Sequence, residues 1–310
     1  MTDISIVIPV RNEAATLREL VVRLTAVMQA LNVTYEIIFV TDVNTDDTVA
    51  VLRDLHRADA HVKPLKLSNA FGHHAAVYAG LAKSRGAAVV IMDGDLQDEP
   101  EDIPRLFECL RAGYDVVYGV KERKNESRLR NACSRAFVTV LTALSDHKVQ
   151  YNTCMFRIVS RRVVNAVLQF QENEPSLTFI MSLIGFLTAA VTVTSGVRAH
   201  GRTKFPFWRQ VNFAITSLLS FSTKPLRLIS CAGLALSGLS LLYLLEMLIE
   251  KLAFGRGTLG WPTVVGLLCL LGGMILFAQG VTGEYIARIF VQSKRRPLYI
   301  VEEWLGDESS

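Results

Sequence analysis

Short hydrophobic runs alternate with segments of helical periodicity through the first 120 residues of the chain. Predominantly apolar runs of this length predict strands that are buried on both faces of a sheet. These runs cover residues 4–9, 35–41, 62–67, 87–92 and 115–119. Between them, apolar residues recur at spacings of three and four, which predicts amphipathic helices. These helices cover residues 16–30, 48–58 and 72–83, and a further helix begins near Pro100. Thr16 and Glu19 fit a capping box at the start of the first helix. The alternation predicts an α/β domain with a mostly parallel sheet and helices on both faces.

The pattern changes beyond residue 200, where long uncharged stretches replace the short runs. Residues 228–245 and 258–283 contain no charged side chain, and each stretch is about long enough to cross a bilayer as a helix. Basic residues flank the pair on both outer sides, so the positive-inside rule places both ends in the cytosol. We therefore expect two transmembrane helices. The alternative is a buried helical hairpin of a soluble protein.

Two further segments have the pattern of helices that lie at a membrane surface. Residues 121–135 are rich in lysine and arginine and continue into an amphipathic stretch, and residues 205–221 carry an apolar stripe with aromatic side chains. Basic amphipathic helices are typical of membrane surfaces, although an ordinary surface helix remains the alternative. The chain is thus expected to contain four parts. They are a cytosolic catalytic domain (1–204), a juxtamembrane helix (205–225), a two-helix transmembrane hairpin (226–290) and a cytosolic tail (291–310).

Composition and charge narrow the classes of function. The chain has 310 residues and a net charge of +4, without a basic patch that is interleaved with aromatic residues, so nucleic-acid binding is not expected. The five cysteines are scattered and none forms a Cys-x-x-Cys pair, which argues against zinc or redox chemistry. The first apolar run is too short for a signal peptide, so we expect the N-terminal part to stay in the cytosol.

The candidate chemistry lies in the sequence Asp93-Gly-Asp95, which follows the fourth predicted strand. Ligands of open α/β sheets bind beyond the carboxyl ends of the strands, and paired carboxylates suit a hard cation such as Mg²⁺ or Mn²⁺. Gly94 is expected to allow a tight turn. Asp42 closes the second strand and is a candidate for the same crevice. The alternatives are a solvated acidic turn for the pair and a helix cap for Asp42. No Gly-x-Gly-x-x-Gly follows the first strand, which disfavours a dinucleotide site.

The order of several motifs resembles that of a known family. The matching stretches are Val7-Ile-Pro9-x-x-Asn12-Glu13, Asp42, Asn69-x-Phe-Gly72-x-His74, Asp93-Gly-Asp95-Leu-Gln97-Asp98, Gly283-Glu-Tyr-Ile-x-Arg288 and Arg296-Pro-Leu-Tyr299. Together they resemble the polyprenyl-phosphate glycosyltransferases of family 2, which have a GT-A catalytic domain, Rossmann-like in its sheet, followed by two transmembrane helices. Tyr151-x-x-Cys154-Met-x-Arg157 and Gly201-x-Thr-Lys204 look closest to the branch that transfers 4-deoxy-4-formamido-arabinose, or a related aminosugar, to undecaprenyl phosphate.

The resemblance implies roles for individual residues. Pro9, Glu13 and Asp42 would hold the nucleobase and ribose of a nucleotide sugar, expected to be a UDP-sugar. Asp93 and Asp95 would hold the donor diphosphate through Mg²⁺ or Mn²⁺.

The same resemblance implies the groups that act on the sugar and on the acceptor. Gln97 would lie near the sugar, and Arg128, Arg202 and Lys204 would receive the lipid phosphate or the donor diphosphate. Asp95, Gln97 and Arg128 are the residues that we assign to catalysis.

The chain departs from the family at three places. It has Thr41-Asp42-Val43-Asn44 where many members have Asn-Asp-Gly-Ser, Glu99 in place of a proline, and Met155 where many members have an aspartate that is assigned as the catalytic base. A phosphomonoester has a second pKa of about 6 and is largely dianionic at neutral pH, so it can attack the anomeric carbon without a base. His73, His74 and His147 are possible polar helpers or structural residues.

We therefore predict a metal-dependent enzyme of the cytoplasmic (inner) membrane. It would transfer a sugar from a nucleotide donor to polyprenyl phosphate with inversion, for modification of an envelope glycan or lipopolysaccharide. Glycines in the predicted spans allow close helix contact and a possible homo-oligomer. A processive polysaccharide synthase is an alternative, but its Gln-x-x-Arg-Trp motif is absent. A catalytically inactive nucleotide-sugar-binding scaffold is the other alternative.

Overall fold

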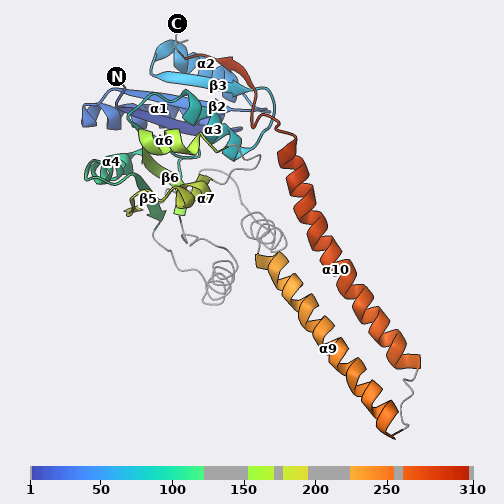
Figure 1. The fold of residues 1–310 in the computed structure, drawn as a ribbon. Helices are drawn as coiled ribbons and strands as arrows, with labels where there is room; N and C mark the ends of the chain where they lie inside the picture. The colour runs from blue at the N-terminus through green and yellow to red at the C-terminus, as the bar shows by residue number, and fades with distance from the viewer. Residues whose placement is uncertain (1, 122–152, 171–176, 195–223, 255–260, 307–310) are drawn as a thin grey trace. The chain divides into compact units, whose positions relative to one another are not determined.

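The computed structural model describes residues 2–121, 153–170, 177–194, 224–254 and 261–306 (Figure 1). The chain divides into two compact units. The first unit comprises Met1–Arg135, His147–Lys204 and Arg296–Ser310, and the second comprises Ala136–Asp146 and Phe205–Arg295.

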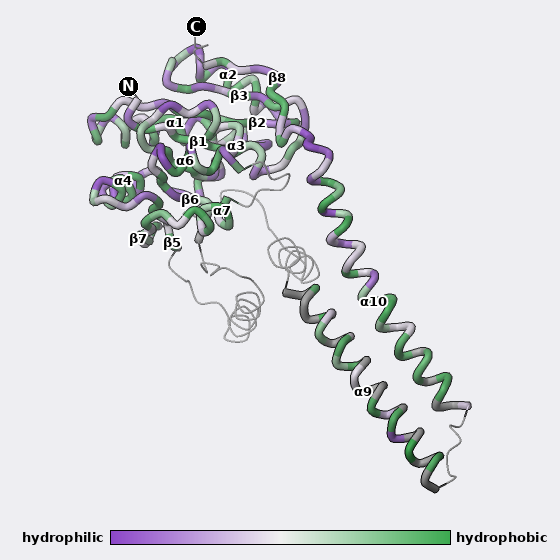
Figure 2. Tube along the Cα trace, viewed as in Figure 1, coloured by the Kyte–Doolittle hydropathy of each residue, from purple (hydrophilic) through white to green (hydrophobic). Residues whose placement is uncertain are grey.

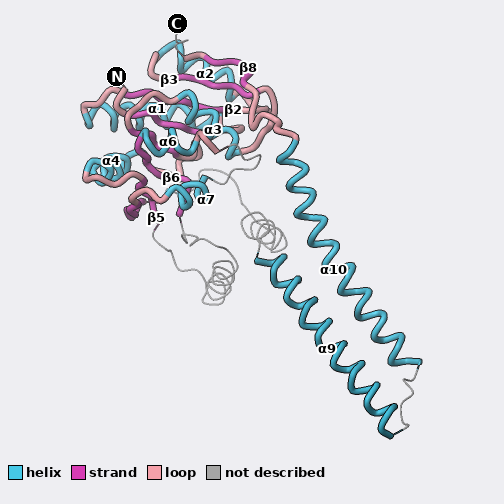
Figure 3. The backbone as a smooth tube through the Cα atoms, viewed as in Figure 1, coloured by secondary structure: helices cyan, strands magenta, loops and turns pink. Residues whose placement is uncertain are grey.

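The first unit is built around one eight-stranded sheet with helices packed on it (Figure 3). The described strands are β1 (Ile4–Val10), β2 (Tyr35–Thr41), β3 (Val62–Leu67), β4 (Ala88–Ile91), β5 (Val116–Lys121), β6 (Thr153–Ser160), β7 (Thr188–Val193) and β8 (Val301–Trp304). The described helices of this unit are α1 (Ala14–Leu31), α2 (Thr48–Ala58), α3 (His73–Lys83), the 3-10 helix η1 (Pro100–Asp102), α4 (Ile103–Arg111), α6 (Arg161–Val167) and α7 (Leu177–Ile184).

The described sheet has the order β7-β5-β6-β4-β1-β2-β3-β8. Strand β1 pairs in parallel with β2 and β4, β2 pairs in parallel with β3, and β5 pairs in parallel with β7. The prediction of a mostly parallel sheet is therefore confirmed. Strand β6 runs antiparallel to both β4 and β5, so it begins at the edge of the sheet where β4 ends.

Two hydrophobic cores lie on opposite faces of the sheet, as the predominantly apolar strands predict. Successive side chains of a strand point to opposite faces, and accordingly Ile6 and Ile8 belong to one core while Val7 belongs to the other. Buried residues of α1, α2 and α4 complete the first core, and buried residues of α3, α6 and α7 complete the second. The prediction of helices on both faces is confirmed.

The start of α1 differs from the prediction. The helix begins at Ala14 with Glu13 as the N-cap residue, and no side chain of that residue caps it. The predicted capping box of Thr16 and Glu19 is wrong, because the Thr16 hydroxyl group donates instead to the carbonyl oxygens of Glu13 and Gly94, at 3.0 Å each. Thr16 thus connects the first turn of α1 to the turn that follows β4.

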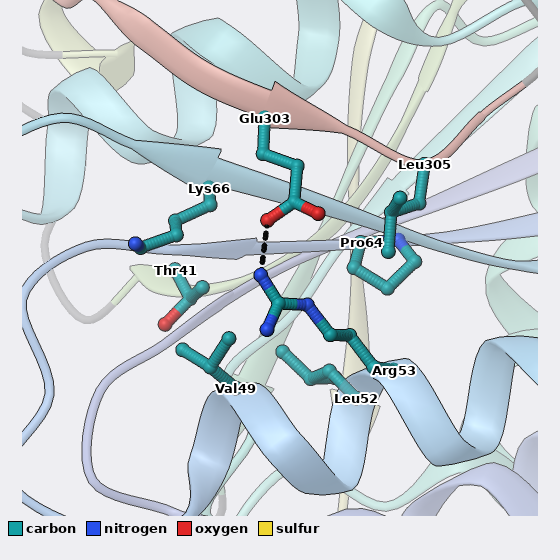
Figure 4. A pocket seen from close by; sticks show the side chains of 8 residues that line it. All are labelled: Thr41, Val49, Leu52, Arg53, Pro64, Lys66, Glu303 and Leu305. Atoms are coloured by element: carbon teal, nitrogen blue, oxygen red, sulfur yellow. Dashed lines mark hydrogen bonds and ion pairs between the residues drawn. The ribbon is translucent and has the colours of Figure 1, made fainter.

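The C-terminal residues complete the sheet of the first unit, which the sequence pattern did not predict. Strand β8 pairs antiparallel with β3, and Trp304 packs against the core on the α3 face. Ion pairs join Arg53 to Glu303 and Lys66 to Glu302, at 2.6 Å each. Figure 4 shows Arg53 and Glu303 reaching toward each other across a small pocket between α2, β3 and β8. This ion pair and the apolar walls of the pocket indicate a structural role, which is to hold β8 against β3 at the edge of the sheet.

The second unit contains two long helices, α9 (Lys224–Phe254) and α10 (Trp261–Ser293). Hydrophobic residues predominate along both of them (Figure 2). Within the described residues, one segment, Leu270–Ser293, is long and apolar enough to cross a membrane by length and composition. Two helices are thus present where two transmembrane spans are expected. The expected span at residues 228–245, within α9, is not confirmed. Glu284 forms an ion pair with Arg288 at 2.9 Å, one turn further along α10.

Candidate active site

The Asp-Gly-Asp turn follows β4 at the carboxyl edge of the sheet, where ligands of open α/β sheets bind. Asp93 and Asp95 are half-buried residues, and the Asp93 side chain is 40% exposed. The Asp93 N–H group donates to Oδ2 of buried Asp98 over 3.1 Å, and the Gln97 N–H group donates to Asp95 Oδ1 over 3.1 Å. Leu96 lies between these bonds with a φ of 61°. A non-glycine residue in this left-handed region is typical of functional turns whose surroundings impose the conformation.

Gly94 is needed for space between its two aspartates. A Cβ atom at this position would clash with Glu13 Oε2 and lie 2.6 Å from Val10 Cγ1. The Gly94 carbonyl oxygen also accepts the hydrogen bond from Thr16. The loop between β1 and α1 therefore packs directly against the Asp-Gly-Asp turn. The sequence predicted a tight turn at this glycine, and the close approach of Glu13 and Val10 is the observed reason for it.

Asp42 follows β2 at the same edge of the sheet and is only 7% exposed. Its Oδ1 atom is buried and accepts no hydrogen bond from the described residues, although Arg11 Nε lies 3.6 Å away. Burial raises the pKa of Asp42 above its usual value, and the nearby Arg11 charge only partly opposes this rise. A buried acceptor of this kind is well suited to a ligand N–H group. Pro9, which pairs with Val40 at the end of β1, is buried beside it in the sheet.

The N-terminus of α1 is occupied by side chains of the neighbouring loop. The Glu13 N–H group donates to Thr48 Oγ1 over 2.9 Å, and the Ala14 N–H group donates to Asp46 Oδ2 over 3.2 Å. Burial opposes ionisation of Asp46, but hydrogen bonds from Thr48 and Ala14 together hold the pKa of Asp46 below its usual value. Helix N-termini after the first strand of an α/β domain commonly bind phosphate. Here an internal carboxylate takes that place, so a donor diphosphate needs a different partner.

His73 and His74 form the first turn of α3, after Gly72 at a φ of 90°. His73 Nε2 lies 3.7 Å from Asp93 Oδ1. Desolvation by the surrounding protein lowers the pKa of both histidines, and the positive charge of Arg157 lowers it further. The imidazole groups therefore favour the neutral form next to the acidic turn.

Arg157 is a fully buried cation beneath this edge of the sheet. It lies on β6 opposite Ile91, and its Nε atom donates to the Met155 carbonyl oxygen over 3.1 Å. Its Nη1 atom donates to Thr178 Oγ1 over 3.2 Å, and its guanidinium carbon lies 5.2 Å from the centre of the Tyr118 ring. Because β6 runs antiparallel to β4 and the pairing ends at Ile91 opposite Arg157, Met155 and Asp93 both lie beyond this pair, at the same edge of the sheet.

The thioether of Met155 lies 3.7 Å from Arg157 Nη2. It cannot accept a proton at neutral pH, so this position supplies no general base. Arg157 was only part of a sequence motif and received no predicted role. The sequence did offer one signal for a functional or structural role of Arg157, because an arginine within an apolar strand is a buried charge that needs several partners.

The structure brings part of the predicted site together. Glu13 contacts the turn that carries Asp93 and Asp95, Gln97 closes that turn, and Pro9 and Asp42 end the two strands beside it. The strand order β4-β1-β2 places all of these residues along one edge. Arg128, Arg202 and Lys204 lie outside the described residues, and their predicted roles remain predictions.

The comparisons with known proteins agree on a class. Residues 5–168 match the family model described as glycosyl transferase family 2. The chain is 35% identical to the bactoprenol glucosyl transferase of Shigella phage SfV, over 96% of this chain and 98% of that protein. It is 32% identical to the undecaprenyl-phosphate 4-deoxy-4-formamido-L-arabinose transferase of Pseudomonas fluorescens, over 98% of this chain and 90% of that protein.

A solved structure supports the fold independently. Glucosyl-3-phosphoglycerate synthase from Mycobacterium tuberculosis, in complex with Mn²⁺, UDP and phosphoglyceric acid, aligns with a TM-score of 0.51 at 21% identity. The alignment covers 71% of this chain and 78% of that one. The α/β fold and the acidic turn at its carboxyl edge thus define a GT-A-like glycosyltransferase domain. The chain belongs to glycosyltransferase family 2, and the resemblance drawn from its motifs is confirmed.

Proposed function

We propose that this protein is an inverting, metal-dependent glycosyltransferase that moves a sugar from a nucleotide donor, expected to be UDP-linked, to polyprenyl phosphate. The observation that carries the proposal is the half-exposed Asp93–Asp95 turn, set beside the buried acceptor of Asp42 at one edge of the sheet. Relatives that match along almost the whole chain are named for transfer to bactoprenol or undecaprenyl phosphate, which supports the acceptor class.

The donor would bind along the edge formed by β4, β1 and β2. Asp42 Oδ1 would accept an N–H group of the nucleobase, Pro9 would border the base, and Glu13 would contact the ribose. The occupied N-terminus of α1 leaves the diphosphate to the acidic turn, because Thr48 Oγ1 and Asp46 Oδ2 already accept the Glu13 and Ala14 N–H groups. A nucleoside diphosphate would then be held at two separate points, by its base at Asp42 and by its diphosphate at the acidic turn.

Asp93 and Asp95 would hold Mg²⁺ or Mn²⁺. These residues suit such a cation chemically, since both offer carboxylate oxygens, which hard cations prefer. Within the described residues no group of three or more metal-ligating side chains is found. The remaining ligands would then come from the donor phosphates and water, as is usual for Mg²⁺ at phosphate sites. When bound, the cation would neutralise charge that develops on the departing diphosphate.

The transfer would be a single displacement. A phosphate oxygen of the lipid acceptor attacks the anomeric carbon, the bond from that carbon to the donor diphosphate breaks, and the nucleoside diphosphate departs. Arg128, Arg202 and Lys204 would receive the acceptor phosphate, and Gln97 would orient the sugar. The acceptor is largely a dianion at neutral pH, so the thioether at Met155 is compatible with catalysis that rests on alignment.

Helices α9 and α10 would anchor the enzyme in the cytoplasmic membrane, with residues 205–225 at its surface and the catalytic unit in the cytosol. The Leu270–Ser293 segment supports one crossing by its length and composition. A crossing by α9 would return the chain to its starting side, so that Arg296–Ser310 can complete the catalytic unit. Association of spans through their glycines would allow a homo-oligomer.

The test uses the purified full-length protein with undecaprenyl phosphate, Mg²⁺ or Mn²⁺, and a panel of UDP-sugars that includes UDP-glucose and the 4-deoxy-4-formamido-arabinose donor. We expect one donor to be consumed and a lipid-linked sugar to appear by mass spectrometry. Asp95→Asn should abolish turnover while the melting temperature is retained. Full activity of this variant would remove the metal role, and consumption of no donor would leave the enzyme proposal without support.

Met155 favours one second candidate, a nucleotide-sugar-binding scaffold without activity. Its thioether stands where many family members carry the assigned base. Calorimetry would distinguish the two functions, because a scaffold binds a UDP-sugar with Mn²⁺ but forms no product with any polyprenyl phosphate.

A further inference from the structure

The loops that follow β1 and β2 are joined by reciprocal hydrogen bonds. The Asn12 N–H group donates to Asn44 Oδ1 over 2.9 Å, and the Thr45 N–H group donates to Asn12 Oδ1 over 2.7 Å. We call this pair of bonds the Asn12–Asn44 clasp. It joins positions that are 32 residues apart in the sequence. One of these loops carries Glu13 and the other carries Asp42.

Asn44 also makes bonds within its own turn. Its Nδ2 atom donates to Thr41 Oγ1 over 2.7 Å and to the Asp42 carbonyl oxygen over 2.8 Å. The position therefore needs one acceptor and two donated hydrogens in a single short side chain. A carboxamide supplies this combination, whereas a carboxylate has no hydrogen to donate and a hydroxyl group has one. Asn44 thus fixes the backbone of Asp42 and the neighbouring loop at the same time.

The backbone conformation of Asn12 restricts which residue types can form the clasp at this position. Its φ of 56° lies in the left-handed region, which asparagine tolerates better than most residues. Its side chain is then held by the bond from Thr45. An unusual backbone conformation that the surroundings impose is typical of functional loops.

We propose that Asn44 is a positioning residue that holds the two donor-binding loops together before the nucleotide arrives. The inference rests on the proposed function, because it takes Glu13 and Asp42 as donor-contacting groups. Loops that are ordered in advance lose less conformational freedom when a ligand binds, so the clasp strengthens donor affinity. Loss of the clasp should weaken donor binding equally in the ground state and in the transition state. The donor KM should therefore rise, and transfer in the bound complex should not slow.

The other end of the same strand pair offers a matched control. The Asp3 N–H group donates to Thr34 Oγ1 over 3.0 Å, and the Thr34 N–H group donates to Asp3 Oδ2 over 2.8 Å. This clasp has the same reciprocal chemistry, but it joins the starts of β1 and β2 and not their ends. Thr34→Ala therefore reports the general cost of losing a connection between these strands.

The experiment measures UDP binding by calorimetry in the presence of Mn²⁺, and initial rates with donor and acceptor varied in turn, on the full-length protein. Asn44→Ala should weaken UDP binding and raise the donor KM by about tenfold, which corresponds to about 1.4 kcal/mol. The kcat and the acceptor KM should stay unchanged, and Thr34→Ala should change none of these constants.

Two variants of Asn12 sharpen the test. Asn12→Gly accepts the left-handed backbone but lacks the acceptor for Thr45, so it should weaken UDP binding. Asn12→Asp keeps that acceptor and should bind UDP like the wild type. If Asn44→Ala does not fold, as thermal melting would reveal, Asn44→Asp provides the measurement, because it keeps the acceptor and loses both donated hydrogens.

Three outcomes would overturn the inference. Unchanged UDP affinity in Asn44→Ala would show that the clasp does not position the donor, while the proposed function would stand. An equal loss of affinity in Thr34→Ala would assign the effect to general stability. Absence of UDP binding by the wild-type protein would remove the proposed function and this inference together.

Discussion

Gly94 is the residue where the loop after β1 touches the acidic turn. A methyl group there would clash with Glu13 Oε2 and come within 2.6 Å of Val10 Cγ1. The Glu13 carboxylate can swing aside on its flexible side chain, but Val10 is a buried β-branched residue, so relief of its contact requires the backbone to shift. Overpacking of this kind typically costs about 1–3 kcal/mol. We expect Gly94→Ala to lose most transfer activity and to lower the free energy of unfolding by an amount in that range.

Activity assays and denaturant unfolding of the same preparation check this prediction. Gly233→Ala is the matched control, because nothing lies within 4 Å of a Cβ atom at that position in α9. Wild-type activity in Gly94→Ala would contradict the view that the close approach of Glu13 fixes the acidic turn.

The residues that end apolar strands could be predicted from the sequence, because the pattern itself marks where a strand stops. Asp42, Asp93 and Asp95 were placed on one sheet edge in this way. Arg157 and Asn44 could not be given roles. Their roles depend on partners such as Thr178 and Asn12, which only tertiary structure brings near. The turn at Val43-Asn44 departs from the family pattern, and its structural role became visible only in the fold, where Asn44 makes three side-chain hydrogen bonds.

Strand β8 is the element that attaches the end of the chain to the sheet of the first unit. Trp304 packs on the α3 face of the sheet, and Gly306 lies directly against its ring. Truncation of a fully buried tryptophan costs about 3–5 kcal/mol, and a partly exposed surface ion pair is worth about 0–1 kcal/mol. Trp304 therefore outweighs the Arg53–Glu303 pair in holding β8 in place.

Because Trp304 is half-buried, we expect Trp304→Ala to lower the free energy of unfolding by about 2 kcal/mol, roughly half the cost of a fully buried tryptophan. Arg53→Gln is the control, because it removes the ion pair to β8 and keeps the Trp304 ring. It should change the free energy of unfolding by less than about 1 kcal/mol. Chemical denaturation of the detergent-solubilised protein measures both. A larger effect of Arg53→Gln would show that charge pairing, and not the indole ring, anchors the strand.

The existence and order of the central elements followed from periodicity, but two features did not. Strand β8 is four residues long and carries the charged pair Glu302 and Glu303, so its sequence has no strand pattern. The cap of α1 was assigned to Thr16 because capping boxes are local, whereas the observed partners of its first N–H groups are Asp46, before α2, and Thr48, at the start of α2. Local patterns predict elements well, and contacts between distant segments determine how the elements end.

At the scale of the whole molecule, the exposed apolar side chains of α10 are the feature that supports the proposed membrane anchor over a helix of a soluble protein. The segment Leu270–Ser293 has no part of its apolar window buried within the described structure. Leu276 is 73% exposed and lies near the middle of α10. A surface of this kind is costly in water over a whole helix, whereas single exposed apolar residues are normal.

A charged substitution tests whether lipid covers this surface. An arginine at the centre of a transmembrane helix costs about 2.5–3.5 kcal/mol for insertion, so Leu276→Arg should reduce the fraction of protein that resists extraction from membranes by alkaline carbonate. Val22→Arg is the matched control, since Val22 is 69% exposed but lies on α1 of the catalytic unit. It should leave membrane retention unchanged, because a charge on a surface in contact with water carries no such cost. Equal retention of both variants and the wild type would show that α10 is not inserted at Leu276.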